Sequence, residues 1–229
     1  MEIIYCANGN PRFAQIAVDH GFLYGAQLPG SVYHPVFFAD QDWKKPDRGK
    51  YMAALAKHKP TMASVLDLER FDQLPEVLSW AEEAAAFVDV VMIIPKVPGI
   101  IDILPRIIAG AAVRLGYSIP TRHGGTIVNP VEFQGWPVHL LGGSPQRQML
   151  YSQRFDLVAS IDGNYAKRMA AMYCEFWMDG RWHELSDHGY HERNDAMYEA
   201  FDWSCKHIMA AWKRQGTFSD LPLFAEATP

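Results

Sequence analysis

The feature that most constrains the fold of this chain is a series of eight short apolar runs, each ending at a polar or glycine-rich cluster. Most of the runs are continuous rather than alternating, which is typical of strands buried on both faces of a parallel sheet. We therefore expect eight parallel strands. The runs cover residues 3–6, 22–26, 36–39, 62–66, 88–94, 112–118, 138–141 and 157–161.

Helix-compatible segments lie between most of these runs. The first has Asn10 as a plausible cap and Pro11 at the first helical position. Eight strands with intervening helices within residues 1–178 predict an α/β fold, a compact (β/α)8 TIM-like barrel in which some helices are reduced. An open doubly wound sheet is the structural alternative. The expected helices cover residues 11–19, 47–57, 74–87, 100–108, 145–153 and 165–176.

Residues 179–229 differ from the barrel segment, because they are polar, aromatic and rich in histidine before a helix-like run at 196–214. We expect a C-terminal helical appendage that serves as a lid or as a partner surface. Hydrophobic residues make up 49% of the chain and charged residues 21%, which indicates a globular protein rather than a disordered one.

Cellular location is suggested by the start of the chain and by its cysteines. The chain begins directly with the strand-like MEIIYCAN, which indicates no signal peptide, and no apolar run is long enough to span a membrane. Three scattered cysteines without a CxxC pair predict a cytoplasmic protein that has no structural zinc. The net charge of −5 argues against a general nucleic-acid coat protein, although it permits a local basic groove.

Three aspartates, Asp40, Asp67 and Asp162, each follow a predicted strand directly. Polar side chains at the carboxyl ends of barrel strands meet at one mouth, where active sites lie. Carboxylates there can attack an anomeric carbon and move protons, or they can bind Mg²⁺. The alternative is that each one caps a helix or pairs with an arginine.

Further candidates lie at other strand ends. Lys96 can hold a phosphate, pair with an aspartate, form a Schiff base or be a solvated rim residue. Arg122 and His123 precede a Gly-Gly pair whose backbone can approach a base or a phosphate, although a tight turn also explains the glycines. Gly142 and Gly143 open a helix in the barrel position that commonly binds anions.

Two segments resemble the tRNA-guanine transglycosylase superfamily: HLLGGSP and FDLVASIDGNYAKRMA. The resemblance implies that Asp162 is the nucleophile. It also implies that Asp40, in FFADQD, is the general base and that Asp67, in SVLDLE, binds the incoming base. The family's Gly-Gly-Phe-Gln after the base is replaced here by Gln41-Asp42-Trp43, which leaves Asp42 as a second candidate for that role. The family's Gln-Gly-Gly after strand five is replaced by Pro-Lys-Val, and its cysteine-rich zinc site is missing.

The short chain looks like the DNA-directed branch of that superfamily, the DpdA-like proteins of phages and bacteria. This resemblance implies that guanine in DNA is exchanged for a preQ0-type 7-deazaguanine, without a cofactor or a metal, in the host cytoplasm if the protein is phage-encoded. Lys96, Arg122 and Arg147 are then candidates for phosphate contacts. Two alternatives stay open: a metal-dependent barrel hydrolase using Asp40, Asp67 and His123, and a non-catalytic barrel that binds nucleic acid or protein. The sequence indicates no particular oligomeric state.

Overall fold

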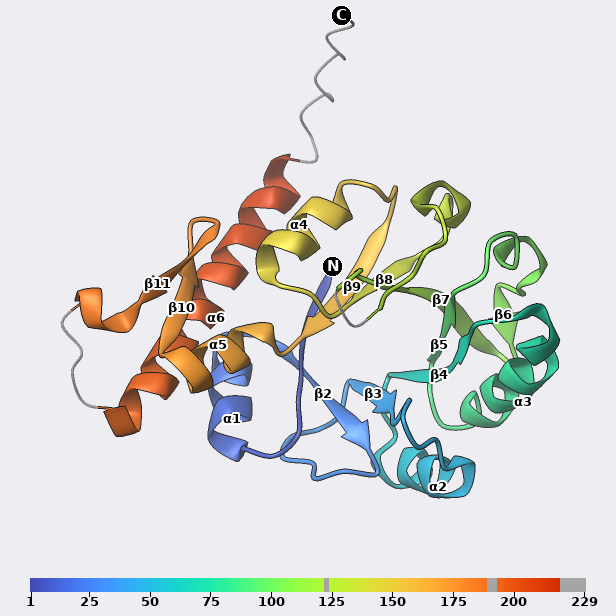
Figure 1. The fold of residues 1–229 in the computed structure, drawn as a ribbon. Coiled ribbons are helices and arrows are strands. Elements are labelled where there is room, and N and C mark those ends of the chain that lie inside the picture. The colour runs from blue at the N-terminus through green and yellow to red at the C-terminus, as the bar shows by residue number, and fades with distance from the viewer. Residues whose placement is uncertain (122–123, 189–192, 219–229) are drawn as a thin grey trace, which may run out of the picture.

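A computed structural model describes residues 1–121, 124–188 and 193–218. Its main feature is a closed barrel of eight parallel strands in the order β1-β2-β3-β4-β5-β7-β8-β9, with β9 paired to β1 and β5 paired to β7 (Figure 1). The predicted TIM-like barrel is confirmed, and the open sheet is wrong because both edges are paired. The strands are β1 (Glu2–Cys6), β2 (Leu23–Leu28), β3 (Phe38–Gln41), β4 (Met62–Leu68), β5 (Val90–Pro95), β7 (Ala111–Ser118), β8 (Val138–Leu141) and β9 (Val158–Gly163).

Helices follow several of these strands on the outside of the barrel (Figure 1). The first begins where it was expected, because the Asn10 side chain accepts hydrogen bonds from the backbone N–H groups of Arg12 and Phe13, with Pro11 at the start. The helices of the barrel segment are α1 (Pro11–Asp19), α2 (Arg48–His58), α3 (Leu74–Ala84), α4 (Pro145–Ser152) and α5 (Tyr165–Tyr173), with short 3₁₀ turns η1 (Phe71–Gln73) and η3 (Pro130–Phe133).

The helix expected at residues 100–108 is wrong. That segment holds the 3₁₀ turn η2 (Ile101–Ile103) and the short strand β6 (Ile107–Ile108), which pairs antiparallel with β7. Pro105 explains the difference, since a residue before proline is pushed out of the helical region, and Leu104 has φ −79° and ψ 136°. The connection from β5 to β7 therefore lacks an α-helix, which helps to make this barrel compact.

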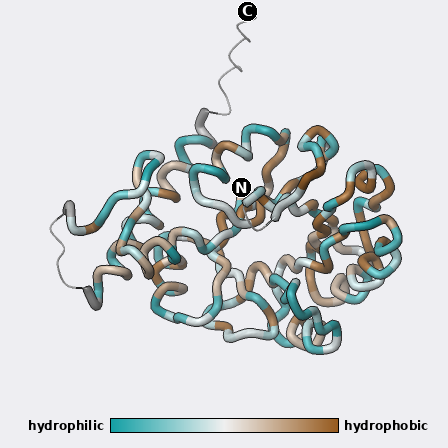
Figure 2. Tube along the Cα trace, viewed as in Figure 1, coloured by the Kyte–Doolittle hydropathy of each residue, from teal (hydrophilic) through white to brown (hydrophobic). Residues whose placement is uncertain are grey.

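The barrel interior is filled with side chains, so it is a core and not a pore. Gly116 shows how tightly it is packed, because a Cβ there would lie 2.7 Å from the side chain of Ile94. A larger apolar cluster lies between the strands and the helices, and Figure 2 shows hydrophobic stretches along the strands. The buried interior cluster consists of Ile4, Cys6, Phe38, Met62, Met92 and Ile94.

The C-terminal segment forms a hairpin of β10 (Glu175–Met178) and β11 (Arg181–Glu184), the turn η4 (Leu185–His188) and the long helix α6 (Arg193–Phe218). Near the start of α6, the Tyr198 hydroxyl accepts a hydrogen bond from the Asn10 side chain. Further along, the Phe201 ring lies 5.3 Å from the ring of Tyr5 on β1. Helix α6 thus packs on the outer layer of the barrel beside α1 and α5 (Figure 1). No helix within the described residues is long and apolar enough to cross a membrane.

Candidate active site

The carboxyl ends of the barrel strands surround a cavity with an empty volume of about 1410 Å³, including space open to solvent. Four of the predicted site side chains line it: Asp40 from β3, Asp67 from β4, Lys96 after β5 and Asp162 from β9. Gly142, which follows β8, lines it as well. The structure therefore brings these five residues to one mouth.

Asp67 reaches the mouth because β4 contains a β-bulge. The register between β4 and β5 shifts between Ser64 and Asp67. Strict alternation from Ser64, whose hydroxyl meets the mouth residue Asp40, would turn Asp67 to the opposite face of the sheet. The bulge adds one residue and reverses that alternation, as bulges near active sites often do. Asp67 consequently faces the cavity.

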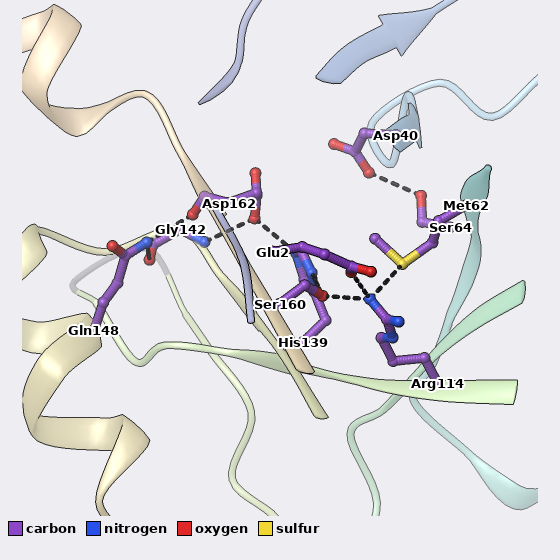
Figure 3. Close-up of polar contacts among 10 residues, drawn as sticks. All are labelled: Glu2, Asp40, Met62, Ser64, Arg114, His139, Gly142, Gln148, Ser160 and Asp162. Carbon is purple, nitrogen blue, oxygen red and sulfur yellow. Dashed lines mark hydrogen bonds and ion pairs between the residues drawn. The ribbon is translucent and has the colours of Figure 1, made fainter. Parts of the chain in front are cut away.

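One oxygen of Asp162 is held in place and the other is left for chemistry. Asp162 Oδ1 lies 3.1 Å from His139 Nε2 and accepts a hydrogen bond from the Gly142 backbone N–H at 3.2 Å (Figure 3). No described residue donates a hydrogen bond to Oδ2. These two contacts fix the orientation of the carboxyl group. Asp162 therefore presents a fixed carboxylate with one uncommitted oxygen.

A chain of buried polar groups continues from Asp162 through the barrel interior (Figure 3). His139 is fully buried, and its Nδ1 lies 2.6 Å from Ser160 Oγ. Arg114 donates a hydrogen bond to the same Oγ at 2.8 Å and forms an ion pair with Glu2. A proton on Nε2 can be donated to Asp162 Oδ1, and Nδ1 can then accept the Ser160 hydroxyl proton. In this arrangement the Ser160 oxygen also accepts the hydrogen bond from Arg114.

Asp40 lies across the mouth from Asp162 (Figure 3). Burial, together with the nearby Asp162 carboxylate, raises the pKa of Asp40 from 3.8 to about 7. A hydrogen bond from Ser64 Oγ to Asp40 Oδ1, 2.8 Å long, opposes this shift. A carboxyl group with a pKa near 7 can both give and take a proton at neutral pH. This is the property required of a general acid and base.

Asp67 and Lys96 form a half-buried ion pair at the same mouth, with Lys96 Nζ 3.4 Å from Asp67 Oδ2. Lys96 Nζ also donates a hydrogen bond to Ser118 Oγ at 3.1 Å. Burial raises the pKa of Asp67, and the Lys96 ammonium opposes the rise. Pairing with an aspartate is one of the roles that the sequence leaves open for Lys96. It leaves an Asp67 carboxylate on the cavity wall that can accept N–H donors from a ligand.

Other predicted residues lie away from this mouth. Asp42 accepts hydrogen bonds from the backbone N–H groups of Lys44 and Lys45, so it shapes the turn after β3, and it lines a neighbouring hollow. Gly143 lies behind Gly142 with φ +82°, and a Cβ there would meet Ile119 at 3.0 Å. Arg147 donates to the Pro120 carbonyl oxygen at 2.6 Å and lines a second hollow that adjoins the mouth. Arg122 and His123 lie outside the described residues.

Metal binding and cysteine chemistry are the alternatives to a site built from carboxylates. Within the ranges described, no three histidine, cysteine, aspartate or glutamate side chains are grouped so as to hold a metal ion. The three cysteines are free. Burial and the nearby carboxylates of Asp162 and Asp40 raise the pKa of Cys6 well above its usual value, so it stays a neutral thiol.

Sequence reasoning missed the residues that support Asp162. Strand alternation was the available signal, because His139, Ser160 and Asp162 fall on inward positions of adjacent strands β8 and β9. A further support is Gln148 of α4, whose side-chain amide donates to the carbonyl oxygens of Gly142 and Asp162 at 3.0 and 2.7 Å. No sequence signal predicts these two hydrogen bonds, since they connect the ends of two strands through a side chain on a helix.

Comparison with known proteins gives one result. The model of a family of unknown function, DUF6610, matches residues 17–213. The match runs from the end of α1 into α6 and includes the three mouth aspartates. No curated protein matches the chain. The chemistry must therefore be inferred from the site.

Proposed function

The chain belongs to the DUF6610 family of unknown function, and from its barrel mouth we propose that it exchanges guanine in DNA for a preQ0-type 7-deazaguanine. The observation that carries the proposal is the pair of facing carboxylates. Asp162 has one fixed and one free oxygen, whereas Asp40 has a pKa of about 7. Two carboxyl groups in different environments suit the roles of nucleophile and proton carrier.

In the first displacement, Asp162 Oδ2 attacks C1′ of the deoxyribose. The bond from C1′ to guanine N9 breaks and an aspartyl-glycosyl ester forms. The electron pair goes to N9, which takes a proton from protonated Asp40. Guanine then leaves as a neutral base, and Asp40 is left as a carboxylate.

In the second displacement, the incoming 7-deazaguanine binds in the same cavity. Asp40 accepts the proton from N9 of this base, and N9 attacks C1′. The ester bond breaks, and Asp162 returns as a carboxylate. Two inversions at C1′ give net retention, as in retaining glycosidases. No redox group or nucleotide cofactor enters this balance.

Asp67 is suited to recognise the base. Guanine and its 7-deaza analogues present adjacent N–H donors, and one carboxylate can accept two such bonds. Lys96 fixes the position of Asp67 through their ion pair. Because a stacked and paired guanine cannot reach a closed-end cavity, the target nucleotide must be flipped out or single-stranded.

Two substitutions test the assignment of roles. Asp162→Asn removes the attacking charge, and the loss of covalent catalysis should lower base exchange by several orders of magnitude. Asp40→Asn can offer the leaving base a hydrogen bond but not a proton, so the covalent protein–DNA adduct should form more slowly than in the wild type. Because Asn also cannot take a proton from the incoming base, the adduct that forms should persist. Denaturing electrophoresis with guanine-containing DNA shows the adduct. Base exchange by Asp162→Asn at the wild-type rate would overturn the proposal.

The reaction itself is tested by nucleoside mass spectrometry of DNA incubated with the protein and preQ0. The expected product is a 7-deazaguanine nucleoside together with free guanine in equal amount. Insensitivity of the exchange to EDTA separates it from the metal-dependent hydrolase. A barrel that binds DNA without forming an adduct or product would instead be the non-catalytic alternative.

A further inference from the structure

Two large apolar side chains stand exposed on the rim of the catalytic mouth. Trp43, on the loop between β3 and α2, is 63% exposed, and Ile127, on the loop between β7 and β8, is 80% exposed. Both line the cavity that contains Asp40 and Asp162. A single exposed apolar side chain is ordinary, so the position of these two on the cavity rim is what matters, and an indole there offers an aromatic face to a ligand.

The two residues lie on different sides of the opening. In the ring of strands, β4 and β5 separate β3 from β7 on one side, and four strands separate them on the other. The turn that carries Trp43 is held by side-chain hydrogen bonds, because Asp42 Oδ1 accepts hydrogen bonds from the backbone N–H groups of Lys44 and Lys45. The presentation of Trp43 at the rim therefore follows from a defined backbone turn.

The charges around the mouth indicate how a nucleic acid would approach. Among the residues that the structure describes, four acidic ones (Asp40, Asp67, Glu69 and Asp162) and one cation, Lys96, line the cavity. This excess of carboxylates repels a phosphate and accepts the N–H groups of a base. The turn at the rim does carry cations beside Trp43, because Lys44 Nζ lies 5.2 Å from the indole centroid and Lys45 follows, although the Asp42 carboxylate belongs to the same turn.

The cavity also has a closed floor, because the interior below it is packed with buried side chains such as Ile4, Phe38 and Met92. A polynucleotide cannot thread through the barrel, so the strand on both sides of a base bound in the cavity must leave across the rim. Flat aromatic groups next to cations bind single-stranded nucleic acid in this situation, since each base offers a π-face for stacking.

We propose that Trp43 and Ile127 form a rim clamp for single-stranded DNA, in which Trp43 stacks on a base flanking the target and Ile127 packs against the nucleotide on the other side. The clamp rests on the proposed function for the identity of the target base. The clamp is a binding surface separate from the reacting groups, and it would hold the single-stranded DNA on both sides of the target nucleotide.

The test measures DNA binding in an Asp162→Asn background, where no covalent adduct forms and binding is reversible. The probe is a single-stranded oligodeoxynucleotide with 2-aminopurine beside one guanine, read by fluorescence quenching and by anisotropy. Trp43→Ala should weaken binding by about 5- to 150-fold, the range of one base–aromatic stack, and should remove most of the quenching. Trp43→Phe, which keeps a stacking ring, should restore much of the affinity and much of the quenching.

Matched controls come from exposed apolar side chains that do not line the cavity. Phe71→Ala, at a side chain 52% exposed on η1, should leave binding unchanged. Ile127→Ala should weaken binding several-fold, whereas Val131→Ala, at a side chain 70% exposed on η3, should not. All four positions are exposed, so equal midpoints in urea unfolding should show that each variant folds.

Binding by Trp43→Ala within about twofold of its parent would overturn the clamp, and so would the absence of any binding by the parent. The proposed function is judged separately, by the adduct formed when Asp162 is intact. Trp43→Ala with intact Asp162 should still form the adduct at saturating DNA. Trp43-dependent binding without any adduct would sustain the clamp and reject the base exchange.

Discussion

At the scale of single residues, the central feature is the buried contact of His139 with Asp162. The His139 ring packs against Phe38, with centroids 5.1 Å apart and the planes tilted by 44°, and it contacts both Asp162 and Ser160. A histidine that is fully enclosed and hydrogen-bonded on both nitrogens cannot change its orientation without breaking one of these bonds. His139 therefore acts as a positioning residue that fixes which oxygen of Asp162 is free.

We predict that His139→Phe, which fills the ring space but removes the donor to Asp162, slows adduct formation about 10- to 100-fold, the usual effect of losing an orienting partner. The DNA concentration for half-saturation should not change, because His139 does not line the mouth. His139→Gln, whose amide can donate a hydrogen bond, should recover part of the rate. A lower unfolding midpoint with an unchanged rate would show that His139 is merely structural.

Asp40 gives a prediction about stability and pH. Its raised pKa means that the folded protein keeps a proton that the unfolded chain releases between about pH 4 and pH 7. The folded state binds more protons in this window, so the free energy of unfolding falls as pH rises through it. Above about pH 7 the destabilisation by the ionised Asp40 reaches its full value. Replacing Asp40 with Asn removes this pH-dependent destabilisation, because Asn does not ionise.

We therefore expect Asp40→Asn to stabilise the protein more at about pH 8 than at about pH 5, with a difference on the order of 2 kcal/mol, reduced from the full linkage value because Asp40 is partly exposed. Urea unfolding at both pH values measures it. Asp102→Asn, at an exposed carboxylate on η2, is the control and should show a difference near zero. Equal stabilisation at both pH values would contradict a raised pKa for Asp40.

At the scale of elements, the barrel strands were predictable because each apolar run ends at a polar cluster. The strand-end aspartates followed from the same pattern. Two features were hidden for physical reasons. The bulge that turns Asp67 inward depends on pairing with β5, which local sequence does not encode. The 100–108 segment has helical spacing, but Pro105 and the pairing of β6 with β7 override it.

The barrel interior also holds an ion pair that joins two elements, β1 and β7, through Glu2 and Arg114. Arg114 is mostly buried, with 12% of its side chain exposed, whereas Glu2 is 35% exposed. Removing one partner of such a pair leaves a poorly solvated charge, and here it also removes the donor to Ser160.

We predict that Arg114→Met lowers the free energy of unfolding by about 2 to 4 kcal/mol. The double variant Glu2→Met with Arg114→Met should be less destabilised than the sum of the two single variants, because no charge is then left unpaired. Urea unfolding of the wild type, the two single variants and the double variant gives the double-mutant cycle. Strict additivity would mean that the two side chains do not interact across the barrel.

At the scale of the whole molecule, helix α6 is joined to the barrel by an aromatic cluster. Phe201 is buried, with its ring 5.3 Å from Tyr5 of β1 and 5.1 Å from Phe13 of α1. Ser204 Oγ of α6 accepts a hydrogen bond from the backbone N–H of Trp177 on β10. These contacts bury the outer face of β1, which would otherwise expose apolar side chains to water. We infer that α6 stabilises the barrel as its outer helices do.

This arrangement predicts that the barrel and α6 unfold in one cooperative step. Phe201→Ala removes a buried ring from their contact and should lower the free energy of unfolding by about 3 to 5 kcal/mol. Met172→Ala, at a side chain 60% exposed on α5, is the control and should change stability by less than about 0.5 kcal/mol. The measurement is urea unfolding followed by tryptophan fluorescence and by far-ultraviolet circular dichroism. Coincident transitions that shift together in Phe201→Ala would support a single unit, because two-state unfolding makes all probes report the same midpoint. A separate early transition in Phe201→Ala, with the later midpoint unchanged, would instead show that the barrel is stable without α6.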